Sequence, residues 1–278
     1  MHNDEGVHAL ESDDDLLHLE ERLSALPDPR RHGYVDAQGV RIWFAVFGSG
    51  PPVVLLHGGM GNSTNWACLI PELVDHGYCA ITIDSRAQGR SFWDGKPLHY
   101  TDMAADVRQV LDHLHISRAA IVGWSDGADT GLVLAETSPE RVHALFFFAC
   151  NVDASGTKPF EMTPRIKRVL QHHRKQYAAL SPTPDNFDEV FEAVQRMQSS
   201  EPNYLAAQLA RMDVPTTVCH AENDEFIFRE HLAYLADTLG NARFVLLPGV
   251  GHFAPWQQPA LFNTAVIAFL KRLHTPTE

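Results

Sequence analysis

The sequence has few cysteines, few basic residues and no long hydrophobic run. Its four cysteines are scattered and form no Cys-x-x-Cys pair, which argues against a disulfide framework and suits a reducing compartment. No run approaches the roughly 20 apolar residues that a membrane-spanning helix needs. The first 15 residues lack both the basic and the apolar segment of a signal peptide. We therefore expect a cytoplasmic protein without a membrane partner.

Positive charge is also scarce. The chain carries 22 Lys and Arg against 35 Asp and Glu, a formal net charge of -13. Such a surface repels phosphate backbones and anionic lipids, so neither nucleic acid nor a membrane surface is an expected partner. The expected partner is a small-molecule substrate. The 278 residues, 45% of them hydrophobic, suffice for one large domain, or for one domain with a small insertion.

Residues 1–30 are predicted to form an acidic, helical extension. The expected helix spans Asp13–Ala25, and its leucines recur at three- and four-residue spacing on one stripe (Leu16, Leu19, Leu23). Two interpretations follow from that stripe. The helix packs on its own domain, or it is an arm that forms a homodimer.

Short apolar runs dominate the sequence after Tyr34. The segments 34–36 and 41–47 predict two strands joined by a turn at Gln38-Gly39. Later runs are apolar at both odd and even positions, as strands covered on both faces must be: Val53–Leu56, Cys79–Ile83, Ala119–Val122, Ala144–Ala149, Thr216–Cys219 and Arg243–Leu247.

Helical patterns separate most of these strands. They span Thr64–His76, Asp102–His115, Ala128–Glu136 and Pro259–Leu273. Alternation of strands and helices at this spacing predicts an α/β fold with a parallel, doubly wound sheet. The alternation stops in residues 151–212, which are rich in proline and hold helical segments at Arg165–Leu180 and Phe187–Met197. We expect a core of residues 31–150 and 213–278, with residues 151–212 as a helical insertion.

The five residues Gly123-Trp124-Ser125-Asp126-Gly127 match the pattern G-x-S-x-G. A predicted strand precedes them and a predicted helix follows, which is the context of a nucleophile elbow. Glycines two residues on either side of Ser125 leave room for the tight turn. The hydroxyl then lies near a helix N-terminus that favours developing negative charge. We interpret Ser125 as a catalytic nucleophile.

A serine nucleophile needs a base, and the base needs a carboxylate that orients it. Among 16 histidines, His252 follows the last predicted strand, at the edge of the sheet where open α/β folds bind ligands. Asp224 follows the preceding predicted strand and is the expected acid. Glu222 and Asp153 are the alternatives. The order Ser, Asp, His agrees with this fold.

Other histidines and a glycine-rich loop complete the candidate site. Four histidines on predicted helices are expected to be solvated: His113, His115, His172 and His173. The loop His57-Gly58-Gly59-Met60-Gly61 follows a strand and allows close backbone approach, so the amides of Gly59 and Asp126 are the expected oxyanion hole. His57 itself is interpreted as structural.

These motifs occur in the order of the α/β-hydrolase superfamily, which the chain resembles from Tyr34 to Leu273. The run Asp84-Ser85-Arg86-Ala87-Gln88-Gly89-Arg90-Ser91 is similar to the family's D-x-R-G-x-G-x-S, with Ala87 where glycine is usual. The resemblance implies an eight-stranded, mostly parallel sheet with helices on both faces and a cap inserted after the sixth strand. The elbow resembles that of the valacyclovir hydrolase (biphenyl hydrolase-like) group.

The candidate site favours a serine hydrolase that cleaves a small carboxylic ester, or an amide, through an acyl-enzyme without metal or cofactor. Alternatives on the same fold are a hydrolase-like receptor, a carbon–carbon bond hydrolase and a perhydrolase. Aromatic residues near the motifs or in the cap predict an apolar substrate pocket, although each could be plain core: Trp66, Trp124, Phe160, Phe253 and Trp256.

Asp126 has two interpretations. Its carboxylate directly follows the nucleophile, and a buried charge there needs a partner. A substrate α-ammonium would supply one, as the resemblance to the valacyclovir hydrolase group also implies, and the pocket would then prefer α-amino-acid esters. Alternatively, the side chain caps backbone N–H groups in the first turn of a helix.

Overall fold

The computed structural model describes Leu16, Leu19 and residues 26–273. Most of the helix expected over Asp13–Ala25 therefore lies outside the described residues. Leu16 and Leu19 are both buried in the core that covers one face of the sheet. Within the described part of the chain, no helix is long and apolar enough to cross a membrane.

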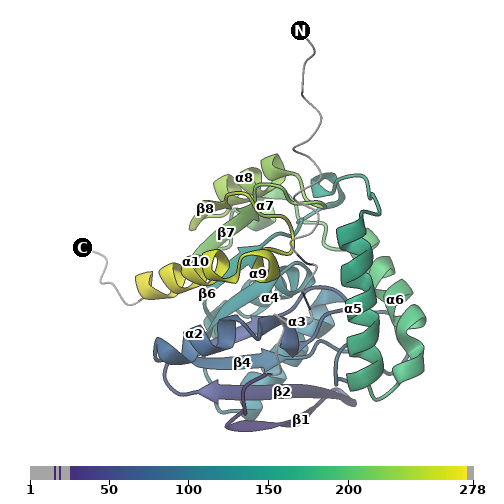
Figure 1. Ribbon diagram of the computed structural model, residues 1–278. Coiled ribbons are helices and arrows are strands. Elements are labelled where there is room, and N and C mark those ends of the chain that lie inside the picture. The colour runs from purple at the N-terminus through teal and green to yellow at the C-terminus, as the bar shows by residue number, and fades with distance from the viewer. Residues whose placement is uncertain (1–15, 17–18, 20–25, 274–278) are drawn as a thin grey trace.

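Eight strands form a single sheet in the order β1-β2-β4-β3-β5-β6-β7-β8 (Figure 1). Their bounds are β1 Arg31–Ala37, β2 Val40–Gly48, β3 Pro52–Leu56, β4 Cys79–Ile83, β5 Ala119–Trp124, β6 Val142–Phe148, β7 Thr216–Ala221 and β8 Ala242–Leu247. β1 and β2 pair antiparallel across the turn at Gln38-Gly39, and β2 pairs antiparallel with β4. The other pairs are parallel. The predicted sheet is thus confirmed, because each predicted strand overlaps an observed one.

Helices cover both faces of the sheet. Their bounds are α2 Leu69–Asp75, α3 Tyr100–His113, α4 Asp126–Thr137, α5 Pro164–Leu180, α6 Phe187–Ser200, α7 Ala206–Leu209, α8 Arg229–Thr238, α9 Ala254–Gln257 and α10 Pro259–Arg272. Short 3-10 turns are η2 Ser63–Trp66, η3 Pro139–Arg141, η4 Ala154–Gly156 and η5 Pro184–Asn186.

The two faces of the sheet bury separate apolar clusters. Ile121 of β5 and Phe147 of β6 pack with residues of α3, α4 and α8. Their neighbours Val122 and Phe146 point the other way and pack with α2 and α10. Successive strand residues point to opposite faces, so a sheet sandwiched between helices needs apolar residues at every position, as the sequence has.

One predicted helix is wrong in its bounds. The segment expected as a single helix, Thr64–His76, is divided into the 3-10 turn η2 and the shorter helix α2. Side chains from the end of the chain take two of its carbonyl groups. The Trp256 indole N–H donates to the Asn65 carbonyl at 3.2 Å, and the Asn263 amide donates to the Cys68 carbonyl at 2.8 Å. Tertiary hydrogen bonds there replace those of a continuous helix.

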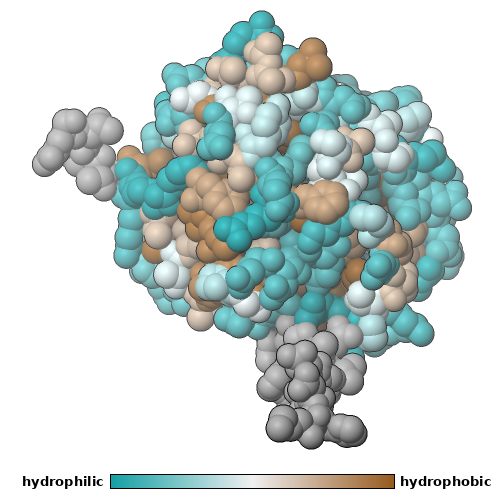
Figure 2. All heavy atoms as spheres, turned by 90° about the horizontal axis from the view of Figure 1, so that it is seen from above, coloured by the Kyte–Doolittle hydropathy of each residue, from teal (hydrophilic) through white to brown (hydrophobic). Residues whose placement is uncertain are grey.

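The segment between β6 and β7 adds no strand to the sheet among the described residues. It holds η4, α5, η5, α6 and α7, and in Figure 1 α5 and α6 stand together beside the sheet. The strand β6 leads directly into this segment. On the face that Figure 2 shows, hydrophilic residues predominate and hydrophobic ones form smaller, separate patches. The division into core and cap at residues 151 and 212 stays a prediction.

Candidate active site

Ser125 lies at the sharp corner between β5 and α4. Its backbone has φ 54° and ψ -127°, a conformation that residues with a side chain rarely adopt. The surrounding chain holds it there, because the Ser125 N–H donates to the Phe148 carbonyl at 2.9 Å and its own carbonyl accepts from Ala128 at 2.6 Å. This is the geometry that the elbow pattern predicts, and strain of this kind accumulates at functional sites.

Glycine is required on both sides of this corner. A side chain on Gly127 would collide with the backbone of Leu56 and His57, and one on Gly123 with the backbone of Gly127 and Ala128. These contacts involve backbone atoms, which have no room to move. The two glycines therefore allow β3, β5 and α4 to meet closely at the elbow.

His252 and Asp224 come together from separate loops. His252 lies between β8 and α9, Asp224 lies after β7, and the His252 Nδ1 is 3.0 Å from Asp224 Oδ2. Both side chains are almost completely buried, with 7% of the His252 side chain and 0% of the Asp224 side chain exposed. The other carboxylate oxygen of Asp224 accepts the N–H groups of Phe226 at 2.8 Å and Ile227 at 2.9 Å. Three donors thus fix the orientation of Asp224.

These contacts shift the pKa values of both groups. Burial alone would raise the pKa of Asp224, but the charge and hydrogen bond of His252 and the Phe226 N–H outweigh burial and hold that pKa below its ordinary value. Burial likewise lowers the pKa of His252, while Asp224 and more weakly Glu225 and Asp126 raise it above its ordinary value. The pair therefore favours an ionised Asp224 that stabilises a protonated His252.

The two alternative carboxylates lie elsewhere. Glu222 is exposed and accepts the Gly249 N–H at 2.8 Å, beyond β8. Asp153 caps the turn η4, where it accepts the Ser155 N–H at 2.8 Å. The structure pairs neither of them with His252.

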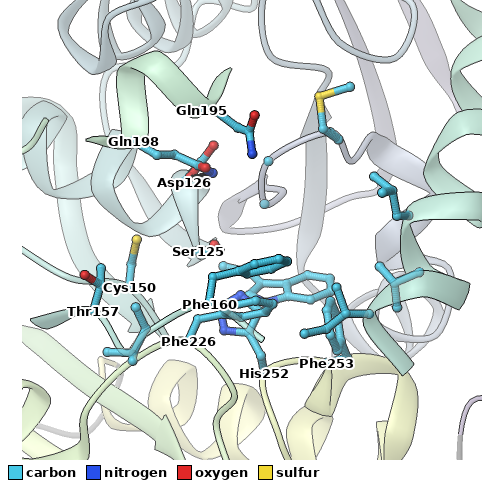
Figure 3. A pocket seen from close by; sticks show the side chains of 18 of the residues that line it. Ser125, Asp126, Cys150, Thr157, Phe160, Gln195, Gln198, Phe226, His252 and Phe253 are labelled. Carbon is cyan, nitrogen blue, oxygen red and sulfur yellow. Dashed lines mark hydrogen bonds between the residues drawn. The ribbon is translucent and has the colours of Figure 1, made fainter. Parts of the chain in front are cut away.

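A cavity of about 320 Å³ opens above Ser125. Figure 3 shows Ser125, Asp126, Phe160, Phe226, His252 and Phe253 around it. Trp124 also lines the cavity, so three of the five aromatic residues expected in a pocket do so, as does Asp126. Trp66 does not, because it is 1% exposed and packs against Trp124 and Phe262 in the core. Trp256, also fully buried, packs edge-on against Trp124.

The glycine-rich loop approaches the elbow closely. Gly58 and Gly59 both line the cavity, and a Cβ on Gly58 would lie 3.1 Å from the Cβ of Ser125. His57 is fully buried. Its Nε2 accepts the Ser85 N–H at 3.0 Å and its Nδ1 contacts the Gly58 carbonyl at 2.8 Å. Burial lowers the pKa of His57, so a neutral ring holds this loop against its neighbour.

The neighbouring loop carries Ala87 at the position where the family that the sequence resembles usually has glycine. Ala87 has φ 68° and is 2% exposed. Glycine adopts that left-handed conformation without the strain that a side chain brings. The chain keeps it with a side chain, held in part by the hydrogen bond from the Ala87 N–H to the Phe92 carbonyl at 2.9 Å.

Asp126 is a second buried carboxyl group beside the nucleophile. Its Oδ1 accepts from the Tyr100 hydroxyl at 3.0 Å and from the Gln198 amide at 2.9 Å, whereas its Oδ2 has no hydrogen-bond partner within the described residues. Burial raises the pKa of Asp126, although Gln198, Tyr100 and the charge of His252 oppose the increase. Both of the hydrogen bonds described for this carboxylate come from side chains and not from backbone N–H groups of α4.

The expectation that the helical histidines are solvated is wrong for two of them. His172 and His173 of α5 are 4% and 8% exposed, and both rings pack against Trp256. Burial and the neighbouring histidines His172 and His57 lower the pKa of His173 to about 3. A neutral His173 therefore lines the cavity. His113 and His115 are exposed, as predicted, although His115 follows the helix α3 instead of lying on it.

Sequence reasoning missed several residues of the site. Tyr100 and Gln198, which hold Asp126, lie 26 and 72 residues away from it and carry no motif. Lys158 lines the cavity and donates to the Asp224 carbonyl at 2.6 Å. Of these residues, only Glu225 could have been suspected from the sequence, because it directly follows Asp224. Its carboxylate accepts the His252 N–H at 2.7 Å.

Known proteins share this architecture. The family model for the alpha/beta hydrolase fold matches residues 51–186. A 2-hydroxy-6-oxononadienedioate/2-hydroxy-6-oxononatrienedioate hydrolase from Escherichia coli is 26% identical over 264 residues, which cover 84% of this chain and 92% of the relative.

Two solved structures are similar in fold. The meta-cleavage product hydrolase of Pseudomonas fluorescens has a TM-score of 0.74 at 18% identity, covering 86% of this chain and 97% of its own. A thermophilic esterase from Thermogutta terrifontis has a TM-score of 0.68 at 22% identity, covering 88% and 100%. The valacyclovir hydrolase grouping stays a prediction. The sheet order, the elbow and the family model agree, and the chain has the α/β-hydrolase fold.

Proposed function

We propose that the protein is a serine hydrolase that cleaves a small carboxylic ester through an acyl-enzyme. The observation that carries this proposal is the strained Ser125 in one cavity with His252, whose ring Asp224 holds at 3.0 Å. A strained elbow serine beside an oriented imidazole is the arrangement that activates a hydroxyl nucleophile.

The chemistry follows from these positions. The Ser125 oxygen attacks the ester carbonyl carbon while His252 accepts the hydroxyl proton. The backbone N–H groups of Gly59 and Asp126 stabilise the negative oxygen of the tetrahedral intermediate. His252 then protonates the leaving alcohol. Water, deprotonated by His252, attacks the acyl-enzyme. The acid is released as His252 returns that proton to the Ser125 oxygen, which restores both groups.

The test is Ser125→Ala with a nitrophenyl ester as substrate. We expect turnover to fall by several orders of magnitude, because a triad without its nucleophile retains little catalysis. The melting temperature should stay close to that of the unchanged protein. A variant that keeps more than about a few per cent of turnover would refute the assignment. A fluorophosphonate should label Ser125 in the unchanged protein and leave the variant unlabelled.

The same assay separates an enzyme from a hydrolase-like receptor. An enzyme releases product in a burst and then continues in a fast steady state. A receptor that keeps the triad would be acylated about once and then turn over slowly. We expect fast turnover, because the cavity is large enough for a substrate and lies directly above Ser125.

A second candidate is carbon–carbon bond hydrolysis. The relative from Escherichia coli is by name a 2-hydroxy-6-oxononadienedioate/2-hydroxy-6-oxononatrienedioate hydrolase, and the protein from Pseudomonas fluorescens is a meta-cleavage product hydrolase, which favours this chemistry. Comparing kcat/KM for a 2-hydroxy-6-oxo-dienoate with that for a nitrophenyl ester distinguishes the two. A higher value for the dienoate would replace the ester assignment and leave Ser125 and His252 in their roles.

Asp126 favours a narrower substrate class. The burial of its carboxyl group, with one oxygen lacking a partner in the described structure, leaves a negative centre beside Ser125 that a substrate cation can satisfy. We propose a preference for esters of α-amino acids. Binding of the ammonium group would lower the raised pKa of Asp126, so a cationic substrate and an ionised carboxylate would stabilise each other.

A further inference from the structure

Glu225 connects the backbone of the proposed base to a helix above the cavity. One carboxylate oxygen accepts the His252 N–H at 2.7 Å, and the other contacts the Arg165 guanidinium at 2.6 Å. The Arg165 and Glu225 side chains are 11% and 12% exposed, so water screens this ion pair little. Neither side chain lines the cavity around Ser125.

Arg165 belongs to the first turn of α5, the helix Pro164–Leu180. The same helix places Ile166, Val169 and His173 on the cavity wall. Thr163 caps the helix by accepting the Ile166 N–H at 3.2 Å. The N-terminus of α5 is thus capped by its own chain. Arg165 connects it to the loop after β7, which carries the proposed acid Asp224.

The residue before His252 makes this contact possible. A Cβ on Gly251 would lie 2.6 Å from Glu225 Oε2 and 2.8 Å from Oε1. Glycine therefore leaves the space through which the carboxylate reaches the next N–H group. The Gly251 N–H donates to the Gln257 side chain at 2.8 Å, which fixes the other side of the loop.

We propose that Glu225 is a positioning residue for His252 and that its ion pair with Arg165 couples the seating of α5 on the core to the placement of the base. This inference rests on the proposed role of His252. When α5 is seated, Arg165 holds the carboxylate under the His252 N–H. Without Arg165 beside it, the Glu225 carboxylate loses the ion pair that holds it under the His252 N–H.

The negative charge of Glu225 allows a second test of the proposal, through the pH dependence of kcat/KM. The groups that face His252 are Asp224 and Glu225 from the loop after β7, Asp126 from α4 and His220 from β7. Arg165 of α5 neutralises part of the charge of Glu225. Glu225→Gln keeps an oxygen that can accept the His252 N–H but removes one of the charges that raise the pKa of His252. The acid limb of the kcat/KM profile should therefore move to lower pH.

The experiment measures kcat, KM and melting temperature for Arg165→Met, Glu225→Ala and Glu225→Gln. We expect kcat to fall by up to about 100-fold in the first two, because small displacements of a catalytic group have effects of that size. KM should change little. Arg165→Lys keeps the charge and should restore most of the kcat lost in Arg165→Met. Glu225→Gln should lose less kcat than Glu225→Ala.

An ion pair on the same helix is the matched control. Arg174 of α5 contacts Asp188 of α6, and both side chains are more than half exposed. Asp188→Asn should leave kcat within about twofold, as expected of an exposed pair. If Arg165→Met and Glu225→Ala lower the melting temperature but keep kcat and the pH profile, the ion pair is only structural and the positioning role is wrong. That outcome leaves Ser125→Ala inactive, whereas failure of the proposed function would leave Ser125→Ala active.

Discussion

The two walls of the cavity are held in different ways. On the core wall, backbone hydrogen bonds fix the reactive groups, as the Phe226 and Ile227 N–H groups fix Asp224. In residues 151–212, the start of the segment pairs with the core backbone, since the Lys158 N–H donates to the Phe226 carbonyl at 2.7 Å. The helices α5 and α6 reach the core through side chains such as Arg165 and Gln198. Phe160 is 64% exposed and stacks on Phe226 with ring centres 6.4 Å apart. Gln198 reaches across to Asp126 at 2.9 Å.

This difference indicates a division of labour. Backbone hydrogen bonds fix atoms within a fraction of an ångström, which chemical steps require. Side-chain contacts between helices and the core tolerate substitution, so the insertion can vary with the substrate. Asp126 lies at the boundary, because it belongs to α4 of the core and is held by Gln198 of α6. Substitutions should therefore have smaller effects as they move from the core wall to the insertion.

The largest effect is expected on the core wall, at Asp224. Asp224→Asn should lower kcat by about 10⁴-fold, because asparagine favours the wrong tautomer of His252 and cannot stabilise its protonated form. Steady-state kinetics with a nitrophenyl ester measures the loss. Glu222→Gln and Asp153→Asn are the controls and should stay within a few-fold of the unchanged protein. A larger loss in Asp153→Asn would move the acid to the loop after β6.

The boundary residue Asp126 should affect discrimination more than catalysis. An α-amino-acid ester should have a kcat/KM about 10- to 150-fold higher than that of its desamino analogue, since a charge-assisted hydrogen bond contributes roughly 1.5–3 kcal/mol. Asp126→Ala should abolish this preference. Equal kcat/KM values for the two esters in the unchanged protein would remove the ammonium site from the proposal, and the triad would be unaffected.

The pH profile connects the two walls. His252 must be neutral to accept a proton, so kcat/KM should rise with pH through the pKa of His252. Burial lowers that pKa and the nearby carboxylates raise it further than burial lowers it, so the midpoint should lie above the ordinary histidine value of 6.5. Asp126→Asn removes one negative charge and should move the midpoint to lower pH. A midpoint that stays fixed would mean that the Asp126 charge does not reach the base.

The smallest effect is expected on the insertion, at Phe160. Phe160→Ala should change the ratio of kcat/KM values for short and long acyl esters by less than about tenfold, because a hydrophobic wall that is partly exposed discriminates weakly. The measurement is kcat/KM over a series of chain lengths. A uniform loss across all esters would instead indicate that the aromatic stack with Phe226 supports the site structurally.

The sequence determined the sheet and the order of its parts. Strands such as Cys79–Ile83 are recognisable because a strand buried on both faces must be apolar at every position. The elbow was recognisable because only glycine fits where backbones meet, as at Gly127 beside Leu56. Position after a strand also singled out His252 and Asp224, because parallel strands deliver their following loops to one edge.

Only the tertiary structure decided what surrounds these groups. Trp66 was expected in the pocket and lies in the core, and His173 was expected in solvent and lines the cavity. Whether an aromatic or histidine side chain faces core, cavity or water depends on how helices pack, which local spacing does not encode. The same holds for Gln198, which meets Asp126 across 72 residues of chain. A motif is set by local backbone geometry, whereas the partners of a buried charge are set by folding.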